Sequence, residues 1–310
     1  MSRSLILDFD ASVRPLPDAA VVSLGDSQEA IRFGCSMAVL RTLGRQLAPV
    51  LDALSPTTVF LGSGDYHHVS YLLIERLRSL GERLQIVVFD NHPDNMRYPF
   101  GIHCGSWVWH VSRLPFVARV HVVGITSNDV EGGHLWENHL LPLYSGKVRY
   151  WCVQRKLRAM RTLGIRYSRS FASTASLLDA FSGAMAASVE PIYLTIDKDV
   201  LAADVVNTNW DQGVMRFEEL TSSIRLLRGR LVGSDVTGDV SSYRYRGRFK
   251  RLLSGLDRQP VIPDRLLEEW QTRHQDVNRE LLALLGSALQ NDKTKTVAEP
   301  WAPTQPVAPA

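Results

Sequence analysis

The sequence predicts an α/β protein in which helices cover both faces of a mostly parallel sheet, a three-layer α/β/α arrangement. Short apolar, largely β-branched segments recur along the chain, and amphipathic segments lie between most of them. Alternation of this kind builds parallel sheets, because each helix returns the chain to the edge where the next strand starts. The expected strands are residues 5–9, 58–62, 84–90, 118–124, 148–152, 192–197 and 231–236.

The helices between these strands follow from apolar residues at helical spacing. We expect helices at 69–80, 135–141, 174–187 and 217–228. A longer helix over 263–289 should pack on the sheet or on a second subunit. Residues 1–289 are predicted to form one α/β domain. The last stretch, 290–310, is rich in proline and poor in apolar residues, which predicts a disordered tail.

Composition and charge restrict the classes of partner and the cellular compartment that we expect. The 310 residues are 45% hydrophobic, and 35 basic against 32 acidic residues give a net charge of +3, too small to indicate nucleic-acid binding. The segment 243–251 interleaves aromatic and basic residues, but such runs usually form a solvated surface. The three cysteines fit neither a disulfide framework nor a zinc motif, and we find neither a membrane span nor a signal peptide. We therefore expect a cytoplasmic protein with buried thiols.

Two acidic motifs follow predicted strands. Asp90, His92 and Asp94 come after one apolar run, and Asp197 and Asp199 come after another about a hundred residues later. Ligands of open α/β sheets bind at the carboxyl ends of strands. A continuing extended backbone would direct alternate residues to the same side, so the ligands of each motif should converge. Clustered carboxylates repel one another without a cation. The motifs therefore predict a divalent metal site.

The donor types indicate which metal. Carboxylates mixed with imidazole and no thiolate favour Mn²⁺, while Fe²⁺, Co²⁺ and Zn²⁺ remain compatible. Four carboxylates exceed what one ion needs, which suggests two ions bridged by shared aspartates. Such a pair can hold a hydroxide that is nucleophilic near neutral pH. We therefore expect two Mn²⁺ ions per chain.

The two motifs resemble those of the arginase and agmatinase (ureohydrolase) family, which belongs to the wider arginase-deacetylase fold. That family carries G-G-D-H, D-A-H-x-D and S-x-D-x-D motifs in the same order and at similar separation. The first motif is matched loosely by residues 62–68, reading G-S-G-D-Y-H-H. The residues that follow the family's ligand histidine match those after His67, so the resemblance favours His67 as the ligand and leaves His68 as the second choice.

The resemblance also implies catalytic roles. The family places a glycine-flanked histidine after its second motif, and His103 in G-I-H-C-G matches it. His103 would then shuttle a proton or contact the substrate, and Asp94 would hold the proton of the hydroxide.

The sequence departs from the family at the substrate side of the site. Where the family has an acidic residue that grips the guanidinium, this chain has Gly238, with Asp239 one position later. Either Asp239 substitutes, or the substrate is not a plain guanidine. The loop 207–213 also differs, and its Trp210 and Asp211 are candidate substrate contacts, as is Asn95.

The sequence thus predicts a metallohydrolase that cleaves a C–N bond in a small-molecule or peptidyl guanidino or amidino compound. Two alternatives stay open: a zinc-dependent amide hydrolase of the deacetylase branch, and a metal-binding scaffold that has lost catalysis. We expect no membrane partner, consider nucleic acid an improbable partner, and regard a homo-oligomer as compatible with the sequence.

Overall fold

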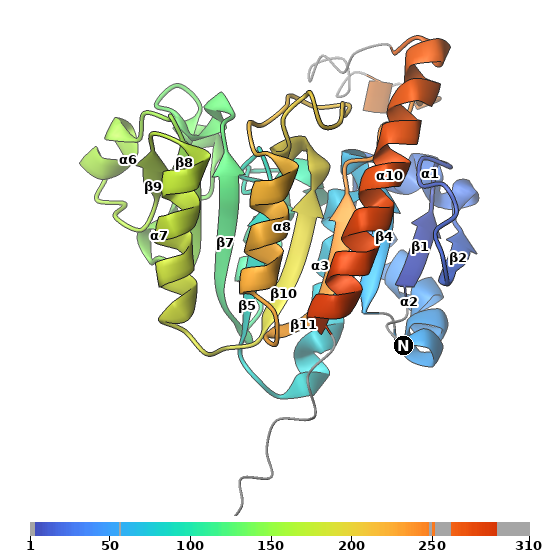
Figure 1. The fold of residues 1–310 in the computed structure, drawn as a ribbon, viewed down its shortest axis with the longest axis horizontal. Helices are drawn as coiled ribbons and strands as arrows, with labels where there is room; N and C mark the ends of the chain where they lie inside the picture. Colours follow the sequence, from blue (N-terminus) through green and yellow to red (C-terminus); the bar gives the residue numbers. More distant parts are fainter. Residues whose placement is uncertain (1–3, 56, 248–249, 252–261, 290–310) are drawn as a thin grey trace, which may run out of the picture.

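The computed structural model describes residues 4–55, 57–247, 250–251 and 262–289. These residues form a nine-stranded sheet in the order β2-β1-β4-β11-β10-β5-β7-β8-β9, and all of its neighbouring strands run parallel. Helices lie on both faces of the sheet (Figure 1). The predicted fold class is therefore confirmed. The predicted tail at 290–310 lies outside the described residues.

The seven predicted strands are present within two residues at either end. They are β1 (Ser4–Asp8), β4 (Thr58–Gly62), β5 (Leu84–Phe89), β7 (Val117–Ile125), β8 (Val148–Val153), β10 (Ile192–Asp197) and β11 (Leu231–Thr237). Sequence reasoning missed the edge strands β2 (Ala19–Ser23) and β9 (Arg169–Phe171), which are only partly buried. It also missed a small antiparallel pair, β3 (Gly34–Cys35) and β6 (Ile102–His103).

One face of the sheet packs against three helices. These are α7 (Thr174–Ala186), α8 (Phe217–Leu226) and α10 (Asp264–Leu289), which lie in front of the strands in Figure 1. Phe89 and Ile196 point to this side, where they join Phe181 and Leu281 in a buried cluster. The long predicted helix therefore packs on the sheet, which was one of its two expected positions.

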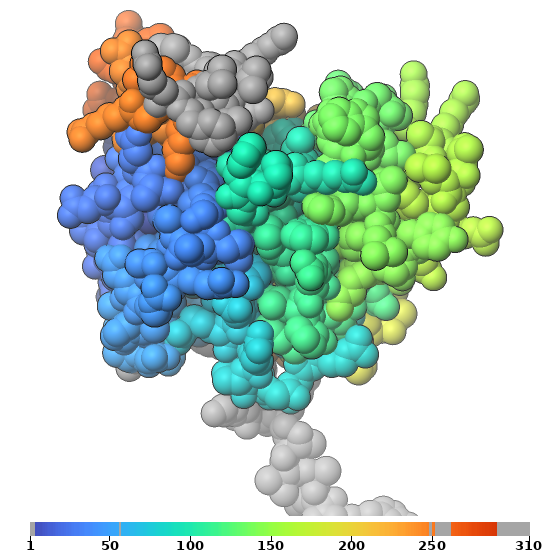
Figure 2. Space-filling model, turned by 180° about the vertical axis from the view of Figure 1, so that it is seen from behind, coloured from blue at the N-terminus to red at the C-terminus, as the bar shows by residue number. Residues whose placement is uncertain are grey.

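The opposite face packs against α2 (Met37–Leu54), α3 (Ser70–Arg76) and α4 (Trp107–Ser112). Figure 2 shows this side of the molecule, built largely from the N-terminal half of the chain in blue to green. Sequence reasoning did not predict α2, which contains Gly44 and Pro49, two residues that normally disfavour a helix interior. Its buried side is nevertheless continuous, through Leu40, Leu43, Leu47 and Leu51.

The prediction of one helix over 135–141 is wrong. The chain forms a short 3-10 turn, Leu135–Glu137, and then α5 (Leu140–Tyr144). Between them Asn138 is extended and buried, and its side chain accepts a hydrogen bond from the Tyr150 hydroxyl and donates one to the Asp129 carbonyl. These two bonds hold Asn138 outside a helix.

Three further expectations concern the surface and the cysteines. Cys35, Cys104 and Cys152 are free and buried. No helix in the described part of the chain combines the length and apolarity needed to cross a bilayer. In the basic segment 243–251, of which 248–249 lie outside the described residues, the Tyr243 hydroxyl bonds Glu29 and the Lys250 ammonium donates to three backbone carbonyls.

Candidate metal centre

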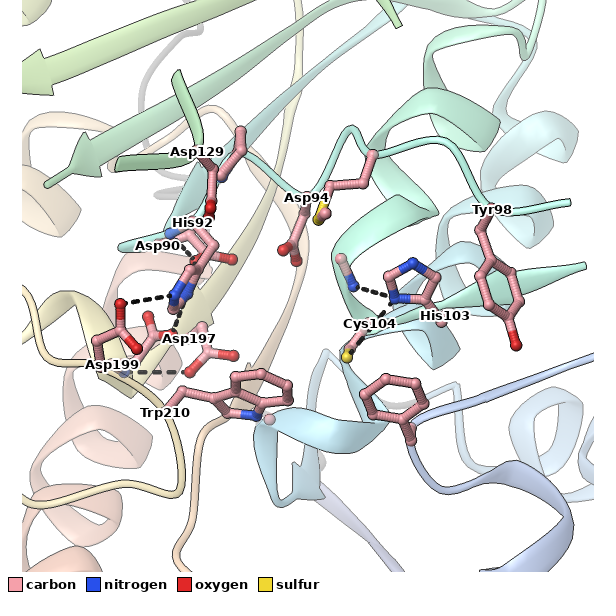
Figure 3. Close-up of a pocket in the computed structure, with 16 residues that line it drawn as sticks. Asp90, His92, Asp94, Tyr98, His103, Cys104, Asp129, Asp197, Asp199 and Trp210 are labelled. Carbon is pink, nitrogen blue, oxygen red and sulfur yellow. Dashed lines mark hydrogen bonds and ion pairs between the residues drawn. The ribbon is translucent and has the colours of Figure 1, made fainter. Parts of the chain in front are cut away.

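The ends of four central strands bring the predicted ligands together. Strands β4, β11, β10 and β5 are consecutive in the sheet, so residues just after Gly62, Thr237, Ile196 and Phe89 reach one edge. Figure 3 shows the acidic side chains gathered there at one end of a cavity. This convergence follows from the parallel direction of the strands.

His67 lies at the centre of a first cluster. Its Nδ1 atom is 3.2 Å from Asp90 Oδ2, 3.1 Å from Asp94 Oδ2 and 3.4 Å from Asp197 Oδ2. The other ring nitrogen, Nε2, is 2.9 Å from the Thr195 hydroxyl. A second hydrogen bond of this kind fixes the ring and aims Nδ1 at the carboxylates, as in many histidine metal ligands.

His92 lies at the centre of a second cluster. Its Nδ1 atom is 2.8 Å from Asp199 Oδ2 and 3.7 Å from Asp90 Oδ1. The ligand atoms of His67, Asp90 and Asp197 lie within 4.8 Å of one another, and so do those of Asp90, His92 and Asp199. Asp90 belongs to both groups. The two groups are therefore adjacent candidate cation sites that share one carboxylate.

The electrostatics of these clusters fit a divalent metal. Burial and the neighbouring Asp94 and Asp199 raise the pKa of Asp90 well above its usual range, and burial with Asp199 raises the pKa of Asp197 to about 8. Burial alone would lower the pKa of His67, but its contacts with Asp90 and Asp94 outweigh this and raise it. His67 Nδ1 and Asp90 Oδ2 are buried, and although they lie 3.2 Å apart, neither makes a hydrogen bond of good geometry in the described structure. Bound cations would satisfy these atoms and relieve the repulsion.

The predicted ligands come together, but not through the extended backbone that we expected after Phe89. Strand β5 ends at Phe89, and Asp94 adopts a left-handed conformation with φ +46. The segment is therefore a turn and not an extended strand, and it sends His92 and Asp94 to different clusters. Aspartate tolerates this conformation better than most residues do.

Trp107 is a site residue that sequence reasoning missed. Its indole Nε1 donates a 2.7 Å hydrogen bond to Asp94 Oδ2, and its ring is fully buried. The ring also lies 4.7 Å from that of His67. Trp107 stands four residues after His103, and no motif marks it in the sequence.

The structure separates the two histidines of the first motif. His67 faces the carboxylates, whereas His68 is fully buried and its Nε2 lies 4.0 Å from the Cys35 sulfur. Burial lowers the pKa of His68 well below its usual value, which is the opposite of the shift at His67. Of the two candidates, the position of His67 fits a ligand and that of His68 does not. The second choice that the sequence left open, His68, is therefore wrong.

Asp239 is not placed to grip a substrate. Its side chain is fully buried, its Oδ1 lies 2.7 Å from the Lys198 ammonium, and it accepts a 2.8 Å hydrogen bond from Asn278 of α10. Gly238 has φ +87, and a Cβ there would lie 2.3 Å from Asp197 Oδ1. No side chain fits at this position, so the acidic clamp expected from the resemblance is absent from both residues.

The cavity beside the clusters has a volume of about 350 Å³. Of the predicted substrate contacts, Trp210 and Asp211 line it, as does His103. Asn95 is not among the described residues that line it. Its amide is fully buried and donates to the His139 carbonyl and the Tyr150 hydroxyl, which corrects the prediction of a substrate contact. The remaining lining residues are Phe33, Gly64, Asp90, His92, Pro93, Asp94, Met96, Tyr98, Cys104, Gly105, Asp129, Asp197 and Asp199.

His103 lies across the cavity from the acidic side chains (Figure 3). Its Nδ1 accepts a 2.9 Å hydrogen bond from the Gly105 backbone N–H. Burial lowers the pKa of His103 to about 4, so the ring is neutral near pH 7. A neutral imidazole that accepts at Nδ1 carries its proton on Nε2. His103 can therefore donate a hydrogen bond from Nε2.

A family comparison agrees with this geometry. The model of the Arginase family matches residues 2–241, which include every candidate ligand. The chain belongs to the arginase family. Ureohydrolases of this family are hydrolases that act on C–N bonds, and the chain has the central sheet and ligand-bearing strand ends of an arginase-family enzyme.

Solved structures of arginase-family enzymes share the fold at low sequence identity. An arginase from Medicago truncatula has a TM-score of 0.58 and 13% identity, with 93% of this chain and 87% of that chain covered. An agmatine ureohydrolase of Thermoplasma volcanium has a TM-score of 0.54 and 11% identity, with 94% and 90% covered. A formimidoylglutamase from Bacillus subtilis has a TM-score of 0.55 and 10% identity, with 93% and 88% covered. No curated protein sequence matches the chain significantly.

Proposed function

We propose that this arginase-family chain hydrolyses a C–N bond of a guanidino or amidino compound with the help of two Mn²⁺ ions. The observation that carries the proposal is the pair of acid–imidazole clusters that share Asp90 at one end of a cavity. His67, Asp90, Asp94 and Asp197 would hold one ion, and His92 with Asp90, Asp197 and Asp199 the other. When bound, such ions supply a nucleophile near neutral pH by lowering the pKa of water.

Asp94 would hold the proton that the attacking water loses. Its Oδ2 accepts from the Trp107 N–H and also faces His67, on the side where the ion would lie, so Oδ1 is the oxygen that would take the proton. As the C–O bond forms and the C–N bond breaks, this proton would pass to the departing nitrogen. The water's oxygen stays on the carbon, and the amine leaves neutral or protonated according to its own pKa.

His103 would act through its Nε2–H. Because the ring is neutral, it would stabilise the departing nitrogen by donating a hydrogen bond and would not deliver a proton as an imidazolium. This refines the shuttle role that the sequence suggested.

The amidinium cation needs a carboxylate that the metal ions do not use. Asp211 and Asp129 are the two such acids among the described residues that line the cavity. The Asp211 carboxylate is exposed and lies 3.7 Å from His92 Nε2, near the metal end. We assign the charge-assisted contact to Asp211 in place of Asp239.

The test combines metal content with turnover. Purified protein reconstituted with Mn²⁺ should hold close to two ions per chain by elemental analysis and should release urea or an amine from members of an amidino-compound panel. Asp211→Asn should keep both ions and lower kcat/KM by about thirtyfold, because a charge-assisted pair becomes a neutral bond. One zinc per chain with amide hydrolysis would support the deacetylase-like alternative. Two ions without any turnover would support the inactive scaffold.

A further inference from the structure

The cavity has two chemically different ends. The metal ligands Asp90, Asp94, Asp197 and Asp199 lie at one end. The uncharged part of the wall consists of Phe33, Tyr98, Trp210, Met96 and Cys104. Tyr98 and Cys104 lie away from the carboxylates (Figure 3), whereas the Trp210 ring reaches the metal end, 6.1 Å from that of His92. A substrate whose amidino group reaches the metal ligands would place the rest of its structure against this apolar wall.

Several rings of this wall are nearly parallel to a neighbouring ring. The Phe33 ring lies 5.7 Å from that of His103 with an interplanar angle of 9°, and 6.4 Å from that of Trp210 with an angle of 19°. The Tyr98 and His103 rings are T-shaped, with their centroids 4.3 Å apart and an interplanar angle of 72°. Nearly parallel rings present flat surfaces, which suit flat or apolar groups.

The backbone at Phe33 is strained. Its φ is +69, a left-handed conformation that is rare for a bulky aromatic residue. Two backbone hydrogen bonds hold it there, from Phe33 N–H to the Asp65 carbonyl at 2.9 Å and from Cys104 N–H to the Phe33 carbonyl at 3.0 Å. Strain of this kind concentrates at ligand sites. The conformation places a buried ring in the cavity wall.

The charges of the cavity exclude anions. Among the described residues that line it there is no lysine or arginine, whereas Asp129 and Asp211 add two carboxylates to those of the metal ligands. Asp129 is held in place by the Ser127 hydroxyl, which donates to it at 3.0 Å. A carboxylate on the substrate would meet these acids without a compensating cation.

We propose that the substrate carries its amidino group on an apolar or aromatic body without a carboxylate. This inference rests on the proposed function, because it assumes that the amidino group occupies the metal end. It implies that guanidino acids are poor ligands, whereas an aromatic guanidine is a good one.

The test compares guanidines that differ in the body. Benzylguanidine, agmatine and 4-guanidinobutyrate would be measured on the Mn²⁺-loaded protein by calorimetric Kd and by kcat/KM for urea release. Benzylguanidine should bind at least about tenfold more tightly than 4-guanidinobutyrate, because the carboxylate of 4-guanidinobutyrate is repelled by Asp129 and Asp211. Agmatine should fall between them, since its ammonium is compatible with the acids but does not pack on the rings.

Two variants test whether Trp210 and Asp129 cause this order of affinities. Trp210→Ala should weaken benzylguanidine about tenfold and leave 4-guanidinobutyrate little changed, and Asp129→Asn should reduce the discrimination against the carboxylate about threefold. Their matched controls are Trp136→Ala and Asp276→Asn, which alter side chains that are 67% and 66% exposed and lie outside the cavity lining. Neither control should change the order.

The outcomes separate this inference from the proposed function. Urea release with equal constants for benzylguanidine and 4-guanidinobutyrate would overturn the inference and leave the function standing. The expected binding order without urea release from any compound would support the cavity inference and overturn the function. A preference for 4-guanidinobutyrate, unaffected by Asp129→Asn, would overturn the inference outright.

Discussion

Two groups of buried aspartates at the same edge of the sheet differ in how their charge is balanced. Asp90, Asp94, Asp197 and Asp199 face one another and two histidines. Asp239, which follows the neighbouring strand β11, instead faces the ammonium of Lys198. The first group lacks a permanent cation among the described residues, and the second carries its own.

Two further buried aspartates are also balanced by a basic side chain of the protein. Asp10 and Asp65 are both paired with the buried guanidinium of Arg32, at 3.0 and 2.7 Å. Asp65 belongs to the first motif, yet its carboxylate is paired with Arg32 and is not among the described residues that line the cavity. A buried acid with a cation from the chain is structural, whereas a cluster of acids without one requires a cation from outside.

The largest effect is expected from a ligand. Asp197→Asn should lose at least one of the two ions and lower kcat/KM by about a thousandfold or more, since a metal contributes several kcal/mol to such reactions. The metal-free variant should nevertheless melt at a higher temperature than the metal-free wild type, because one repelling carboxylate is gone. Elemental analysis, urea release and thermal melts in chelator measure the three quantities.

The stability difference should grow as the pH rises. Burial raises the pKa of Asp197 to about 8, so the metal-free folded chain retains a proton that the unfolded chain releases above pH 4. The carboxyl therefore destabilises the metal-free fold increasingly between pH 4 and 8, and the asparagine does not. A metal-free variant that melts below the wild type at pH 7.5 would contradict the view that the cluster is uncompensated.

The next largest effect is expected at the buried ion pair of Asp239 and Lys198. Asp239→Asn should lower the free energy of unfolding by about 3 kcal/mol, because it leaves the Lys198 ammonium buried without a counter-charge. Metal content should stay at two ions per chain. The double variant with Lys198→Met should recover part of the loss, and denaturant melts measure both. Loss of metal without loss of stability would mean that Asp239 belongs to the site after all.

His103 should contribute through its hydrogen bond. His103→Ala is expected to lower kcat about a hundredfold with both ions retained, which is typical of the loss of one preorganised hydrogen-bond donor. Because the pKa of His103 is lowered to about 4, this group should not titrate between pH 5.5 and 8. The dependence of kcat on pH over this range should therefore have the same shape in the wild type and in His103→Ala. His134→Ala, at a histidine side chain that is 53% exposed, is the control. A limb near pH 6.5 that vanishes in His103→Ala would restore the proton-shuttle role.

The sequence predicted the sheet and the meeting of its candidate ligands at one edge because both depend on local patterns. Strands such as β4 and β10 are continuous apolar runs, and their bounds agree with the expectation. Asp90, His92 and Asp197 stand directly at or after such runs, so the parallel sheet alone brings them to one edge.

The remaining site depends on contacts between distant segments. Asp239 stands one residue from the family's clamp position, but the backbone at Gly238 passes so close to Asp197 that no side chain fits there. Phe33 reaches the cavity through a strained conformation held by Asp65 and Cys104. Neither a close approach nor a left-handed backbone at a phenylalanine leaves a signal in the sequence.

The smallest effect is expected at Trp107, which joins the metal site to the scaffold. Trp107→Phe keeps a buried ring but removes the N–H that orients Asp94, so we expect kcat to fall about tenfold with KM little changed and both ions retained. The matched control is Trp151→Phe, because the buried Trp151 indole also donates a hydrogen bond, to His121 Nδ1 at 3.0 Å, away from the cavity. Both variants should lose similar stability, since each leaves a small void and an unpaired acceptor. Only Trp107→Phe should change kcat, and equal loss of kcat in both would show that the indole of Trp107 supports packing and does not position Asp94.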